Sequence, residues 1–177
     1  MPGICFKQFN TPSLRHAAGL RRFFHNNAVD TIEKAIEFYA TDHFNEKPAV
    51  QLNLRAFDTA GIGIDLTPES VTKVGRFLRV ISAVADLELA QEKEDGSLGT
   101  NSSAANDLLR MSVLDLKRAK RVLKEVGLHP TAVVAIDVSI VFANIAQLLP
   151  PAWPARHSLV QAASQYGTLV KLLMVHE

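Results

Sequence analysis

Apolar residues recur at three- and four-residue spacing along most of the chain, a pattern typical of amphipathic helices. It predicts helices over 27–44, with Asn27 as the N-terminal cap, and over 102–126 and 156–175. Gly127 follows the second of these segments, which predicts that the helix stops there. Helices therefore account for most of the chain.

The segment 67–93 predicts a helix at the centre of the fold. Thr67 supplies a capping hydroxyl and Pro68 suits the first helical position. Two apolar stripes follow, so we expect neighbours on two sides and mostly buried side chains at Phe77, Leu78, Ile81 and Val84. Gly96 and Gly99 are expected to break the helix. The first stripe contains Val71, Val74, Leu78, Ile81 and Ala85, and the second contains Phe77, Val80, Val84 and Leu87.

The most apolar stretch is 131–149, whose length of about 19 residues invites comparison with a membrane span. Four polar residues interrupt it, and a central Asp alone costs about 2.5–3.5 kcal/mol on insertion. A buried helix of a bundle, with no membrane span, is therefore predicted. The interrupting residues are Asp137, Ser139, Asn144 and Gln147, and Pro150, Pro151 and Pro154 follow the helix.

Asp137 and Asn144 lie seven residues apart, on one side of this apolar helix. A buried carboxylate needs a partner or shifts toward its neutral form. The pair either lines a polar pocket for a small ligand or is structural, satisfied by an Arg or by the backbone. We favour the structural interpretation.

The segment between Pro48 and Leu66 fits two patterns. Apolar and polar residues alternate in 50–55 and again in 62–66, which favours two short strands, whereas Val50, Leu54 and Phe57 also fit a helix. We expect a short strand pair or extended loop near 49–66. The whole pattern predicts an all-α, single-domain bundle of five to six helices.

Composition agrees with one folded domain. The chain has 177 residues, 47% of them hydrophobic and 21% charged, which suffices for a core without disulfides. Charge divides it into a basic N-terminal segment, 1–26, and a helical bundle domain, 27–177. The first 29 residues hold four Lys and Arg and no acid, whereas residues 30–177 hold 15 Lys and Arg against 18 Asp and Glu.

The basic segment has apolar residues interleaved with arginines, as in a mitochondrial presequence, but it also fits a first helix with a solvated basic face. We favour the helix. A cytoplasmic location is therefore expected, with the mitochondrial matrix as the alternative if 1–26 acts as a presequence.

Catalytic and metal-binding patterns are sparse. One cysteine, Cys5, excludes an internal disulfide or a cysteine cluster, and no two histidines have metal-ligand spacing. Asp58-Thr59-Ala60-Gly61 matches a short motif of small GTPases, but no phosphate-binding G-x-x-x-x-G-K-[ST] accompanies it. We therefore predict no cofactor, no metal, no catalytic residue and no enzymatic activity.

The strongest candidate site is a cluster of Lys and Arg near the end of the 102–126 helix. If 67–93 and 102–126 form an antiparallel hairpin, three basic residues of the first helix lie at the same end, and acidic residues, including Asp86, Glu94 and Asp107, gather at the other. The candidate partner- or polyanion-binding residues are Lys73, Arg76, Arg79, Arg110, Lys117, Arg118, Lys120, Arg121 and Lys124.

A molecule charged differently at its two ends suits docking to other proteins or to copies of itself. The sequence therefore predicts a non-catalytic interaction or assembly module, part of a larger complex or homo-oligomer. The alternative is binding of nucleic acid or another polyanion through its backbone, without sequence specificity, because no aromatic residue lies among the cations to stack on bases.

Overall fold

The computed structural model describes residues 14–20, 22–24, 26–48, 50, 63–100 and 102–176. Within these ranges the chain is helical and contains no strand, which confirms the all-α bundle. Residues 51–62, the main part of the proposed strand pair, lie outside the described residues. The described helices are the 3-10 helix η1 (Leu14–Gly19) and the α helices α1 (Ile32–Tyr39), α2 (Asp42–Asn45), α4 (Pro68–Leu98), α5 (Ser102–Lys124), α6 (Pro130–Leu148) and α7 (Pro154–His176).

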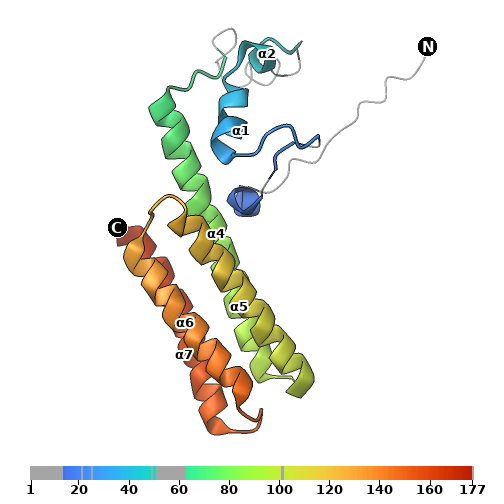
Figure 1. Cartoon of the computed structure of the whole chain (residues 1–177), viewed down its shortest axis with the longest axis vertical. Coiled ribbons are helices and arrows are strands. Elements are labelled where there is room, and N and C mark those ends of the chain that lie inside the picture. The colour runs from blue at the N-terminus through green and yellow to red at the C-terminus, as the bar shows by residue number, and fades with distance from the viewer. Residues whose placement is uncertain are drawn as a thin grey trace, which may run out of the picture.

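The four long helices α4, α5, α6 and α7 form an up-and-down bundle (Figure 1). Each helix packs against the next, and α7 returns to α4. Short connections make consecutive helices antiparallel, as is usual in such bundles. The core between them includes Leu87, Leu116, Leu123, Ile136 and Val170, all fully buried.

The first half of α4 extends beyond the bundle and packs against η1 and α1, and α2 contacts α1 (Figure 1). A second apolar cluster forms there from Ile32, Ile36, Val71 and Leu78. Polar contacts add to it, because the backbone N–H of Ala18 donates to the Ser82 hydroxyl at 3.1 Å. Part of the basic N-terminal segment is therefore packed against α4.

Local capping determines where the helices begin. The Thr67 hydroxyl accepts a hydrogen bond from the Ser70 N–H, as predicted. The helix predicted over 27–44 is instead two helices, because Thr31 caps α1 by accepting from the Lys34 N–H, and Thr41 caps α2. Asn27, the expected cap, lies outside both helices.

The turns match the predicted breaks in most places. Gly127 has φ of +63°, which suits glycine, and α6 begins at Pro130. Gly96 does not break α4, which continues to Leu98 and ends at Gly99.

Phe77 corrects the expectation of a helix buried on two sides along its whole length. Its side chain is 63% exposed, whereas the adjacent Leu78 is 8% exposed. Ile81 and Val84 are half-buried. The reason is that α4 extends beyond α5 to α7 at this level and is covered on one side only, by η1 and α1.

Candidate interaction surface

The predicted basic residues are mostly engaged within the chain. On α4, Lys73 pairs with Glu69 at 2.7 Å, and Arg79 is buried, with both terminal nitrogens directed at the Glu33 carboxylate of α1. The hydrogen bonds from Arg79 hold the pKa of Glu33 below its ordinary value. Arg79 therefore fastens α1 to α4 and is not on the surface.

Arg118 lies where α5 packs against α4, and its side chain is half exposed. It pairs with Asp115 and, through Nε at 3.3 Å, with Asp86, and Lys93 pairs with Asp115 from the other side. Burial raises the pKa of Asp86, although Arg118 and the nearby His16 oppose that shift. This network joins η1, α4 and α5 around two buried carboxylates.

These contacts change the expected separation of charge. Asp86 and Glu94 are buried between helices and do not belong to an exposed acidic end. Glu88, Glu92, Asp95 and Asp107 are exposed, but Arg110 pairs with Asp107 at 3.2 Å and brings a cation among them. The acidic end is thus smaller than the sequence predicted.

A basic hollow of about 310 Å³ lies along the end of α5, lined by Lys117, Lys120, Arg121, Lys124 and Glu125. Two of its four cations have partners or contacts within the chain. Lys120 Nζ lies 2.5 Å from Asp137 Oδ1 on α6, and Arg121 lies 3.8 Å from Glu125 and 3.5 Å from the Gly19 carbonyl. Lys117 and Lys124 have no ion pair with any described residue, and neither does Arg76 on α4.

Asp137 and Asn144 are not a buried pair, because Asn144 is exposed. Asp137 is half exposed and bound to Lys120, while the Asn144 Oδ1 accepts at 3.5 Å from the Gln147 amide. The structural interpretation holds for Asp137, with a Lys as its partner in place of the expected Arg or backbone.

The largest departure from expectation is on α6, of which only one face is buried. The opposite face carries five apolar residues separated by four, three, four and three positions, which we call the α6 seam: Val134, Val138, Val141, Ile145 and Leu148. Four of the five are 41–82% exposed, and Val138 is half-buried. This alternation is the heptad spacing by which one helix packs along another.

Length and composition alone would allow α6 to cross a membrane, with a mean hydropathy of 1.8 over its most apolar window, of which 33% is buried. Its contacts with α5 and α7 include polar groups. Asp137 meets Lys120, and the buried Ser139 hydroxyl donates to the Ala163 carbonyl at 2.9 Å.

Sequence reasoning missed the seam because it treated all apolar positions of this helix as core. The signal was present in the spacing, since residues 134–148 are apolar on two opposite faces, as 71–87 are. Reasoning from sequence also missed Glu94, which is buried at helical spacing from Leu87 and Ala90.

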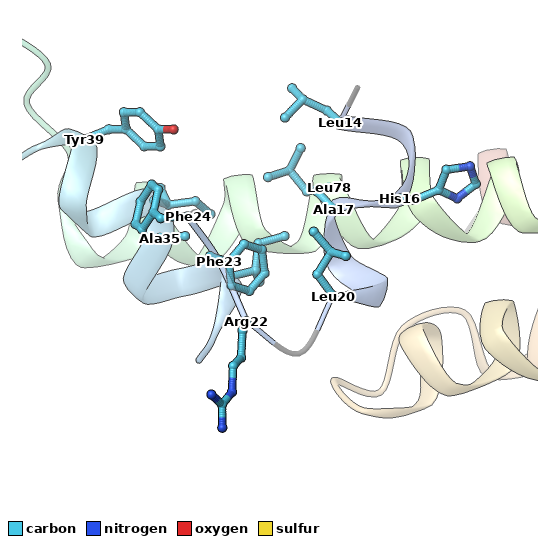
Figure 2. Close-up of a pocket in the computed structure, with 12 residues that line it drawn as sticks. Leu14, His16, Ala17, Leu20, Arg22, Phe23, Phe24, Ala35, Tyr39 and Leu78 are labelled. Carbon is cyan, nitrogen blue, oxygen red and sulfur yellow. The ribbon is translucent and has the colours of Figure 1, made fainter. Parts of the chain in front are cut away.

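A separate apolar pocket of about 550 Å³ lies between η1, residues 22–24, α1 and α4 (Figure 2). Leu14, Leu20, Phe23 and Tyr39 contribute to its lining. The side chain of Arg22, which also borders it, extends away from the apolar groups. The pocket thus offers volume for an apolar group but few polar groups to orient one.

No group of three or more His, Cys, Asp or Glu in the described part of the chain is placed to hold a metal ion. No protein-family model, curated protein or solved structure matches this chain.

Proposed function

We propose that this chain is a non-catalytic helical module that assembles with another protein through the outer face of α6. The observation that carries the proposal is the exposure of the α6 seam. Val134, Val141 and Leu148 project from one face of a well-packed helix and remain 63%, 52% and 82% exposed.

Apolar residues of α7 are also exposed. Leu169 and Leu172 are 42% and 56% exposed. Apolar residues that are exposed singly are common, but a continuous row on one helix face is typical of surfaces that bind another protein. The seam runs about 21 Å, enough to contact three turns or more of a partner helix.

The test compares two variants that introduce the same charge. Val141→Asp places a carboxylate in the middle of the seam, and Thr72→Asp places one on an exposed position in the first half of α4, which extends beyond the bundle. Because both sites are exposed, we expect both variants to fold, as checked by thermal unfolding.

The readout is the native mass of the tagged chain in extracts of its own cells. Wild type and Thr72→Asp should migrate in an assembly larger than 19.4 kDa, and Val141→Asp should migrate at the mass of the free chain. An assembly that survives Val141→Asp would overturn the proposal, as would a wild type that migrates alone.

A second candidate function is nonspecific binding of a polyanion in the hollow on α5. It is favoured by the proximity of four cations in that hollow, of which Lys117 and Lys124 have no ion-pair partner among the described residues. The salt dependence of binding, treated in the Discussion, tests it.

A further inference from the structure

We infer that the partner of the α6 seam is an amphipathic helix with acidic residues along one flank. This inference rests on the proposed function and adds the chemistry of the partner. It follows from the juxtaposition of the seam with the lysines of α5, which we call the lysine row: Lys117, Lys120 and Lys124.

The lysine row borders the seam along its α5 side. Lys120 meets Asp137, which stands one position before Val138 of the seam. Lys117 and Lys124 lie one turn on either side of Lys120, on the same face of α5. Because α5 and α6 are antiparallel, Lys117 comes level with residues near Val141, and Lys124 with residues near Val134.

The spacing and side-chain type of the seam favour a helix over a lipid surface. Val134, Val138, Val141 and Ile145 are β-branched, with few rotamers, and stiff side chains at heptad spacing suit packing into another helix. Surfaces that insert into lipid more often present Trp, Phe or Leu.

A second copy of this chain is a poorer occupant for electrostatic reasons. A twofold axis across α6 would place the lysine row of one copy against the lysine row of the other. An axis along α6 would place the row against α7, where residues 154–176 include no Asp or Glu. The first arrangement offers the lysines only Asp137 and Glu125 of the other copy, which already pair with Lys120 and Arg121 there, and the second offers no acid on α7. An acidic flank on another helix would pair with the lysines.

The experiment uses the purified full chain and two synthetic peptides of four heptads. Both have Ile and Leu at the apolar heptad positions. One has Glu at the flanking positions and the other has Lys there, so that like charges keep each peptide from pairing with itself at neutral pH. Binding is followed by fluorescence anisotropy at low salt.

We expect the Glu peptide to bind at least about tenfold more tightly than the Lys peptide, because Lys117 and Lys124, which have no ion pair with a described residue, attract one and repel the other. The double variant Lys117→Glu/Lys124→Glu should reverse this preference. Arg76→Glu, an exposed site on α4 far along the chain from the lysine row, is the control and should leave the preference unchanged. Val141→Asp should abolish binding of either peptide.

The other outcomes overturn the inference in distinguishable ways. Equal binding of both peptides that is lost in Val141→Asp would support α6 as a docking surface but would contradict the inference that the partner is acidic. Binding of the Glu peptide that survives Val141→Asp would indicate general attraction of anions to α5. Binding of neither peptide would also reject the inference, whatever the native-mass experiment shows.

Two further measurements test other occupants of the seam. Sedimentation of the wild-type chain as a dimer that Val141→Asp dissociates would identify a second copy. Tighter binding to phosphatidylserine vesicles than to the Glu peptide, lost in the same variant, would identify a lipid surface.

Discussion

The Ser112 hydroxyl on α5 donates a hydrogen bond of 2.5 Å to Oε1 of Glu94 on α4, whereas Glu94 Oε2 has no hydrogen-bond partner among the described residues. Glu94 is 1% exposed, and burial raises its pKa from 4.5 to about 7. The folded protein therefore holds a proton on Glu94 more tightly than the unfolded chain does. Stability from this group is fully present below pH 4.5 and is lost as the pH rises toward 7.

We predict that Glu94→Gln removes this loss. The rise in the pKa of Glu94 from 4.5 to about 7 corresponds to about 3 kcal/mol of unfolding free energy. The free energy of unfolding of the variant should therefore exceed that of wild type by up to about 3 kcal/mol at pH 8 and match it near pH 4.5. Urea unfolding at the two pH values measures both differences. Glu92→Gln, at an exposed position, is the control. Equal differences at both pH values would show that Glu94 does not carry this linkage.

A pair of adjacent residues tests the position of the core along α4. Leu78→Ala should lower the free energy of unfolding by about 2–4 kcal/mol, because Leu78 is buried against Ile32 and Ile36. Phe77→Ala should cost about 0.5 kcal/mol or less, because Phe77 is 63% exposed. Denaturant unfolding of both variants decides the order, and the reverse order would contradict this packing.

The contact between Arg79 and Glu33 should govern how firmly α1 is attached. Glu33→Gln removes a charged partner of buried Arg79 and should cost about 1–2 kcal/mol, a modest figure because the Glu33 side chain is 35% exposed. The loss should appear as faster amide hydrogen exchange in α1 and unchanged exchange in α6.

Acid should have the same effect on α1. Because the hydrogen bonds from Arg79 keep the pKa of Glu33 below 4.5, this contact stabilises the fold above that pH and is lost as the pH falls. Lys34→Ala, which breaks an exposed pair with Asp30, is the control and should leave α1 protected. Faster exchange throughout the bundle in Glu33→Gln would show that α1 is not a separate unit of stability.

Salt dependence tests the second candidate function. If a mixed-sequence DNA duplex binds in the hollow on α5, changing Lys117, Arg121 and Lys124 to Gln should reduce the log–log salt slope by about 0.9 for each lost phosphate contact. The same substitution at Arg22, Lys34 and Lys47 removes equal charge elsewhere and should change the slope less. Equal slopes for the two triple variants would reject the hollow as a phosphate site.

Helix positions were predictable because they depend on nearby residues. Thr67 followed by Pro68 marks the start of α4, and Gly127 followed by Pro130 separates α5 from α6. The break between α1 and α2 was missed because apolar spacing continues across it, although Thr41 supplies a second cap.

The burial and the ion-pair partner of each charged side chain were less predictable, because they depend on the neighbouring helix. Arg79 and Lys73 look alike in the sequence, yet one is buried against Glu33 and the other is exposed beside Glu69. Likewise, apolar spacing shows that α6 has two apolar faces but not which one the bundle covers. Tertiary packing alone decides both questions.

The two apolar faces of α6 raise a problem of rotational specificity. Turning α6 by half a turn about its own axis would bury Val134, Val141 and Leu148 and expose Ile136, Ile140 and Ala143 at little hydrophobic cost. It would also break the hydrogen bond from the Ser139 hydroxyl to the Ala163 carbonyl and the ion pair between Asp137 and Lys120. These two polar contacts therefore favour the observed rotational setting, to which the small side chains of Ala132, Ala135, Ala143 and Ala146 on the buried face also contribute by close packing.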